Sequence, residues 1–86
     1  MTRRTIIITG GSRGIGASIS TAFYATGNHV VIASRSDNGM ASTLGDRACF
    51  VVADVRKPKT LQDLVRKTID WTGQLDVLVN NAGVAM

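Results

Sequence analysis

One stretch limits what this chain can fold into more than any other: an apolar run that ends in a glycine-rich turn. Residues 5–9 read Thr-Ile-Ile-Ile-Thr, and residues 10–16 read Gly-Gly-Ser-Arg-Gly-Ile-Gly. An uninterrupted run of β-branched residues is typical of a strand that is buried on both faces, as in a parallel sheet. The glycines that follow indicate a tight turn. We therefore expect a strand, a turn and a helix in that order.

The same alternation continues along the chain. Helices are predicted over residues 14–26 and 58–71, with a shorter one over 37–44, and strands over 29–34, 48–53 and 75–79. Parallel strands joined by right-handed helical crossovers, with helices on both faces, make an α/β, doubly wound parallel sheet. We expect one unit over residues 1–86, with the strand order 3-2-1-4 and a sheet truncated after the fourth strand.

Each of the two longer helices is predicted to bury one face. In the first, Ile15, Ile19 and Phe23 recur at helical spacing, with Ala22 beside them. In the last, Pro58 suits the first turn and Gly73 ends the helix. The residues expected on the buried face of this last helix are Leu61, Leu64, Val65, Thr68, Ile69 and Thr72.

Composition excludes several classes of protein. Hydrophobic residues make up 44% of the 86 residues and charged residues 19%, which is typical of globular proteins. The net charge is +4, but the basic residues are dispersed and no aromatic residues interleave with them, so we expect no nucleic-acid partner. No apolar run approaches the roughly 20 residues of a membrane span, and the run at 6–8 is too short for a signal peptide. We therefore expect a cytoplasmic protein that does not bind membranes.

The single cysteine, Cys49, excludes an internal disulfide and is interpreted as a small buried apolar residue. No cluster of histidines and cysteines occurs that would hold a metal, so no metal site is predicted.

The glycine turn has the features of a site for a bound pyrophosphate. Gly10 allows the chain to leave the strand sharply, while Gly14 and Gly16 keep side chains away from the ligand and let the helix approach the sheet. The N–H groups of the helix N-terminus would face the phosphates. A nucleoside triphosphatase loop would need lysine after Gly16, where this chain has Ala17.

The end of the second strand predicts which dinucleotide binds. NAD-binding sites place Asp or Glu here for the ribose hydroxyls, and a site for S-adenosylmethionine would also need an acidic residue, but this chain reads Ala33-Ser34-Arg35-Ser36. Arg35 and Arg13 could both reach a ribose 2′-phosphate, and Ser34 offers a hydroxyl. Asp37 is interpreted as the start of the next helix. Two charge-assisted bonds would favour NADP over NAD by roughly 10²-fold.

Three motifs resemble the short-chain dehydrogenases/reductases of the classical type. Residues 9–16 match the family pattern Thr-Gly-x-x-x-Gly-x-Gly, residues 54–55 match its Asp-Val pair, and residues 80–83 match its Asn-Asn-Ala-Gly. The resemblance implies the N-terminal part of a Rossmann domain whose parent enzyme interconverts an alcohol and a carbonyl by hydride transfer with NADP(H). It also implies a homo-oligomeric parent.

The resemblance assigns roles to individual residues. The glycine turn would line the pyrophosphate and the adenosine ribose. Asp54 would accept a hydrogen bond from the adenine amino group, and the Val55 backbone would contact the adenine ring. The Asn81 segment would run alongside the adenosine ribose. Together with the residues chosen above, the predicted cofactor contacts are Gly10, Ser12, Arg13, Gly14, Ile15, Gly16, Ser34, Arg35, Asp54, Val55, Asn81, Ala82 and Gly83.

The catalytic residues of the family have no counterpart here. The family uses Tyr-x-x-x-Lys with a serine, but the only tyrosine, Tyr24, lies in the first helix with Asn28 four residues later. We therefore expect no catalysis by these 86 residues alone. Two alternatives to an enzyme fragment are a stand-alone NADP-binding module and a subunit completed by another chain. The apolar fourth strand, an open edge, favours a fragment or a subunit completed in trans.

Overall fold

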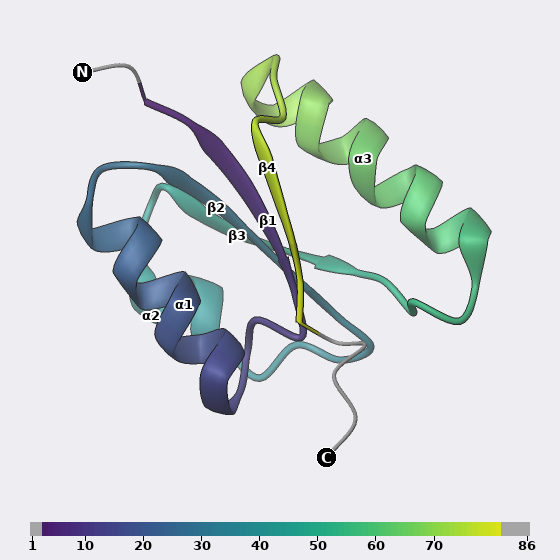
Figure 1. Ribbon diagram of the computed structural model, residues 1–86, viewed down its shortest axis with the longest axis horizontal. Helices are drawn as coiled ribbons and strands as arrows, with labels where there is room; N and C mark the ends of the chain where they lie inside the picture. The colour runs from purple at the N-terminus through teal and green to yellow at the C-terminus, as the bar shows by residue number, and fades with distance from the viewer. Residues whose placement is uncertain (1–2, 82–86) are drawn as a thin grey trace.

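The computed structural model describes residues 3–81, and the predicted contacts Ala82 and Gly83 lie outside them. Strands and helices alternate through the described chain (Figure 1). The elements are β1 (Thr5–Thr9), α1 (Gly14–Ala25), β2 (His29–Ser34), α2 (Met40–Leu44), β3 (Ala48–Val52), α3 (Pro58–Thr72) and β4 (Val77–Asn80). None of these helices is long and apolar enough to cross a membrane.

The four strands form one parallel sheet in the order β3-β2-β1-β4, which confirms the predicted order. The central strand β1 is buried along its whole length, as its uninterrupted β-branched run predicted. Ile7 lies opposite Val31 of β2 on one side and Leu78 of β4 on the other. All four strands therefore point the same way, and the loops after β1, β2 and β3 meet at one end of the sheet.

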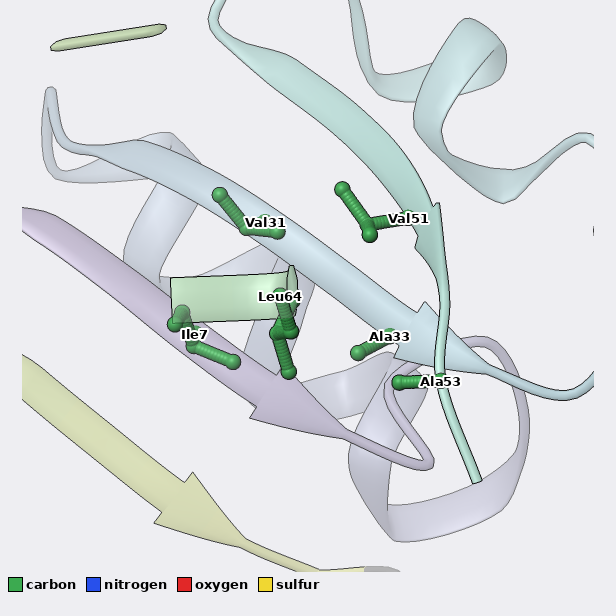
Figure 2. Close-up of a cluster of buried hydrophobic side chains, with 6 residues drawn as sticks. All are labelled: Ile7, Val31, Ala33, Val51, Ala53 and Leu64. Atoms are coloured by element: carbon green, nitrogen blue, oxygen red, sulfur yellow. The ribbon is translucent and has the colours of Figure 1, made fainter. Parts of the chain in front are cut away.

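Helices cover both faces of the sheet, with α1 and α2 on one side and α3 on the other (Figure 1). On the α3 side, Leu64 packs onto side chains from the three strands β1, β2 and β3 (Figure 2). On the other side, Ile19 and Phe23 of α1 pack against the opposite set of strand residues. Adjacent residues of β1 therefore belong to different cores, because strand side chains alternate between the two faces.

The second helix is shorter than the sequence predicted. It begins at Met40, not at Asp37, and Gly39 precedes it in a left-handed conformation. The Asp37 carboxylate accepts a hydrogen bond from the Gly39 N–H at 2.8 Å, and the Asn38 side chain accepts one from the Met40 N–H at 3.2 Å. These local bonds compete with helical bonding, so residues 37–39 form a turn and the interpretation of Asp37 as the helix start was wrong.

The buried face of α1 also differs from the predicted one. Ile15 is 65% exposed, because it lies in the first turn of the helix, beyond the strand end that Ile19 and Phe23 cover. The fully buried positions are instead Gly16 and Ser20. Small residues let α1 come close to β1, and the Ser20 hydroxyl donates to backbone carbonyl oxygens at 2.8 and 3.0 Å. An apolar pattern could not identify this face.

The face of α3 is only partly covered. Leu64 and Thr68 are buried as predicted, but Val65 is 37% exposed and Ile69 is 45% exposed. The predicted apolar face of α3 is therefore buried at its centre and exposed at these two residues. The strand ends differ slightly as well: β3 ends at Val52 and β4 covers 77–80 in place of 75–79.

Candidate functional site

A cleft lies at the carboxyl ends of β1, β2 and β3, where the first three strand-to-helix loops meet. Its volume is about 570 Å³. In open α/β sheets, ligands bind at the carboxyl ends of the strands. The residues that line the cleft are Thr9, Gly10, Ser12, Arg13, Ala33, Ser34, Arg35, Ser36, Ala53, Asp54, Val55 and Arg56.

The glycine turn brings the backbone of α1 close to the end of β1. Gly14 has a φ of +53°, a left-handed conformation that disfavours other residues. A Cβ atom on Gly16 would overlap the Gly10 carbonyl oxygen and lie 2.7 Å from the Asn81 side-chain nitrogen. Only a residue without a side chain therefore allows this contact between helix and strand.

The N-terminus of α1 is the candidate anion site at this end of the sheet. The helix begins at Gly14, and the N–H groups of a first helical turn have no acceptor within the helix. No acidic side chain occupies this turn. Asn38 stabilises the glycine turn that precedes this helix, because its side-chain amide donates to the Ser12 carbonyl oxygen at 2.9 Å. The exposed N–H groups and the helix dipole together favour a bound phosphate group.

Two cationic side chains lie at the β2 side of the cleft. Arg13 precedes α1 and Arg35 follows β2, and both are exposed. Neither forms an ion pair with any residue between 3 and 81. The Ser34 hydroxyl donates to the Ser36 carbonyl oxygen at 2.8 Å, so its hydrogen is used within the loop. The cleft therefore presents two uncompensated guanidinium groups at this point and no carboxylate.

The only ion pair in the cleft joins Asp54 and Arg56. The Asp54 Oδ1 atom accepts bonds from the Arg56 backbone N–H and Nε at 2.9 and 3.0 Å, and Oδ2 accepts one from Nη2 at 2.9 Å. The side-chain and backbone hydrogen bonds from Arg56 hold the pKa of the Asp54 carboxyl well below its usual range. Thr60, in the first turn of α3, accepts from the Asp54 N–H and donates back to its carbonyl oxygen, both at 2.9 Å.

Asn81 supports the glycine turn from the end of β4. Its backbone N–H donates to the Thr9 hydroxyl at 3.1 Å, and its side-chain amide donates to the Gly10 carbonyl oxygen at 3.2 Å. Asn81 therefore ties β4 to the point at which the chain leaves β1.

Most of the predicted contacts meet in the cleft. Four of the described contacts do not line it: Gly14, Ile15 and Gly16 in the first turn of α1, and Asn81 after β4. Arg56 lines it but was not predicted, since in the sequence it belongs to a basic cluster over 56–59. The spacing Asp-x-Arg directly after a strand could have identified it. The predicted contacts that line the cleft are Gly10, Ser12, Arg13, Ser34, Arg35, Asp54 and Val55.

Two other reactive side chains lie away from the cleft. The Tyr24 ring is half-buried, and the Arg47 guanidinium carbon lies 4.0 Å from its centroid. Cys49 is partly buried against the α3-side core, and burial raises the pKa of its thiol to about 11. Residues 3–81 contain no group of three or more histidine, cysteine, aspartate or glutamate side chains that could hold a metal ion.

Comparison with protein families places the whole described chain in one group. A family model described as short chain dehydrogenase matches residues 4–86. Among curated proteins, tropinone reductase-like 1 of Erythroxylum coca is 40% identical over 84 residues, which cover 94% of this chain and 31% of that protein. The chain therefore spans about a third of the length of such relatives.

Solved structures resemble the fold closely. A short chain dehydrogenase from Bacillus anthracis is 30% identical with a TM-score of 0.85, over 91% of this chain and 35% of that one. A 3-ketoacyl-(acyl-carrier-protein) reductase from Brucella melitensis, crystallised in complex with NADH, is 31% identical with a TM-score of 0.83. That likeness covers 87% of this chain and 32% of the reductase.

Proposed function

Because the chain belongs to the short chain dehydrogenase family, we propose that its cleft binds NADP(H). We also propose that the chain forms the cofactor-binding half of an oxidoreductase that interconverts an alcohol and a carbonyl. When bound, the nicotinamide would supply the hydride-transfer chemistry. The residues described here would bind and orient the cofactor.

The N-terminus of α1 is the proposed site for the pyrophosphate. The N–H groups of a first helical turn have no acceptor within the helix, and with the positive dipole end they favour anions. The glycine turn leaves room for a close approach. Asn81 and Asn38 hold this turn from two sides, so the donors would be pre-arranged before the cofactor arrives. Pre-arranged donors strengthen binding because less freedom is lost on association.

The preference for NADP is supported by one observation above all: the cleft offers Arg13 and Arg35 where an NAD site would offer a carboxylate. Both guanidinium groups lack a carboxylate partner among residues 3–81. A 2′-phosphate would neutralise them, and arginine suits phosphate groups because it can donate two parallel hydrogen bonds.

Asp54 and Val55 are proposed to receive the adenine. Both line the same cleft as Arg35. The Asp54 carboxylate is ionised at neutral pH, so it can only accept hydrogen bonds, and adenine carries an amino group that donates. Val55 is 39% exposed and offers an apolar contact for the ring.

The residues that move protons during catalysis are proposed to lie elsewhere in the parent enzyme. The only tyrosine of the chain, Tyr24, packs against Arg47 near the amino ends of the strands, and no lysine follows it four residues later. The full-length polypeptide should consume NADPH with a carbonyl substrate, followed as the loss of NADPH absorbance, while residues 1–86 alone should not.

The cofactor preference is tested by calorimetric titration of the chain with NADP and with NAD. NADP should bind roughly 10²-fold more tightly, and the joint change Arg13→Ala and Arg35→Ala should remove most of that difference. Arg66→Ala is the control for each of the two single changes, because it also removes one positive charge, from an exposed site on α3 that is paired with Asp63. Equal affinity for the two cofactors in the unaltered chain would refute the preference.

A further inference from the structure

The ion pair beside the proposed adenine site leaves very little of Asp54 available to a ligand. Arg56 is two residues away, and its backbone N–H and guanidinium group bind the Asp54 carboxylate together. The Asp54 side chain is 13% exposed, whereas that of Arg56 is 69% exposed. The carboxylate is therefore enclosed by its partner and by the cleft, not displayed freely to solvent.

The acceptor sites of Asp54 can be counted. A carboxylate oxygen has about two lone-pair sites, so the two oxygens offer about four. Oδ1 already accepts two hydrogen bonds and Oδ2 accepts one, all of them from Arg56. Within residues 3–81, one acceptor site on Oδ2 remains for a ligand. The forked contact through Nε and Nη2 also prevents the carboxylate from rotating.

We infer that Arg56 is a positioning residue that makes Asp54 selective for adenine. This inference rests on the proposed binding of NADP(H) in the cleft. One fixed acceptor suits the amino group of adenine, which donates at position 6 of the ring. Hypoxanthine carries a carbonyl oxygen at that position, and this oxygen would face the carboxylate lone pair. A carboxylate free to rotate could instead accept from the ring N1–H of hypoxanthine and would distinguish the two bases poorly.

A second role for Arg56 would be direct contact with the 2′-phosphate, since Arg13 and Arg35 line the same cleft. The geometry favours positioning, because Nε and Nη2 of Arg56 are already bound to Asp54. Asp54 also offsets the charge of Arg56, while Arg13 and Arg35 have no such partner among residues 3–81. The two roles predict different changes in binding.

The experiment compares three ligands with the chain by calorimetry: NADP, NAD, and the NADP analogue in which hypoxanthine replaces adenine. The unaltered chain should bind NADP about tenfold more tightly than the hypoxanthine analogue. Arg56→Ala should reduce this ratio to nearly one and leave the ratio of NADP to NAD affinity unchanged. Arg56→Lys keeps the charge without the fork, so an intermediate base ratio is expected. Arg66→Ala serves as the charge-matched control.

Failure of the proposed role of Arg56 can be distinguished from failure of the proposed NADP(H) binding. A purely structural role would weaken NADP and its hypoxanthine analogue by the same factor, and an unchanged base ratio in Arg56→Ala would therefore overturn the inference. A selective loss of NADP over NAD affinity in Arg56→Ala would identify a phosphate ligand and would overturn it too. If the unaltered, folded chain binds neither NADP nor NAD, the proposed function fails and the inference fails with it.

Discussion

The two ends of the sheet carry similar side chains and use them differently. At the amino ends of the strands, Arg47 donates to the carbonyl oxygens of Tyr24 and Asn28 at 3.0 and 2.6 Å, and its guanidinium lies over the Tyr24 ring. At the carboxyl ends, Arg13 and Arg35 have no ion-pair partner among residues 3–81. Arg47 therefore links the segment before β3 to the end of α1, while Arg13 and Arg35 remain available to a ligand.

Each end of the sheet also has a cavity, and the two cavities are similar in volume. The cavity at the amino end, about 610 Å³, is slightly larger than the functional cleft. It is lined by Phe23, Val77 and the Asn28 turn, among others. Both the nitrogen and the oxygen of the Asn28 side-chain amide form hydrogen bonds. The Asn28 amide donates to the Phe23 carbonyl oxygen at 3.0 Å, and its side-chain oxygen accepts from the Arg4 N–H at 3.3 Å. Size alone therefore does not identify a binding site, and the position of the cleft at the carboxyl ends of parallel strands is what favours it.

The largest expected effect tests whether the carboxyl end depends on close backbone contact. In Gly16→Ala the new Cβ would overlap the Gly10 carbonyl oxygen, and a backbone atom cannot move aside cheaply. We expect a loss of about 3 kcal/mol in the free energy of unfolding. The gain in helix propensity, about 1 kcal/mol, does not offset the clash. Urea denaturation followed by circular dichroism measures the change.

NADP affinity is a second measure of the same close contact. To relieve the clash in Gly16→Ala, α1 would have to move away from β1, and this would move its N-terminus away from the pyrophosphate. Gly16→Ala should therefore also lose NADP affinity. Gly27→Ala provides a comparison at the other end of the helix, where an added Cβ meets no atom within 4 Å but φ is +91°. Its stability should fall while NADP affinity stays the same. Unchanged stability in Gly16→Ala would contradict the close contact.

The next effect separates the two kinds of arginine. Arg47→Ala should lower the free energy of unfolding by about 2 kcal/mol, because two carbonyl oxygens lose a charged donor and the Tyr24 ring loses its stacked cation. NADP affinity should not change. The change Arg35→Ala should do the reverse and reduce affinity without reducing stability. The comparison breaks down if Arg47→Ala weakens binding in a chain that remains folded.

The smallest effect concerns His29 at the amino end, whose ring meets Trp71 edge-on with centroids 5.1 Å apart. Partial burial, with the charges of Arg3 and Arg47, holds the pKa of His29 below its ordinary value of 6.5. The unfolded chain therefore takes up the proton first. This contribution to stability is complete above about pH 6.5 and is lost as the pH falls toward the lowered pKa of the folded state.

We expect less than about 0.5 kcal/mol from this titration, because the ring is only partly buried and solvent screens its charges. The measurement is the urea midpoint of the unaltered chain and of His29→Gln between pH 7.5 and about pH 5. As the pH falls through this interval, the urea midpoint of the unaltered chain should decrease relative to that of His29→Gln. A midpoint that rises on acidification only in the unaltered chain would reverse the sign and refute the prediction.

Local patterns were sufficient for much of this molecule. The alternation of strands and helices, the strand order 3-2-1-4 and the burial of β1 all follow from runs of apolar residues and from the handedness of parallel crossovers. The glycine turn could be placed between β1 and α1 because glycine spacing is itself a local property. Most of the residues predicted to contact the cofactor accordingly line one cleft.

Features that depend on what lies opposite a residue were not predictable. The sequence suggested that Ile15 would be buried, but its helical turn lies beyond the end of the sheet. The error at Asp37 was of another kind, because local side-chain bonds over residues 37–40 compete with the helix.

By itself, the sequence determined the order of the elements and the end of the sheet at which chemistry can occur, because periodicity and glycine spacing are properties of neighbouring residues. Only the tertiary structure decided which donors are used up and which remain free. Arg47 and Arg35 are the same residue type, but Arg47 donates to the carbonyl oxygens of Tyr24 and Asn28 from packed elements far away in the sequence. Arg35 forms no ion pair among residues 3–81. The charge of an arginine belongs to its residue type, whereas its availability depends on the fold.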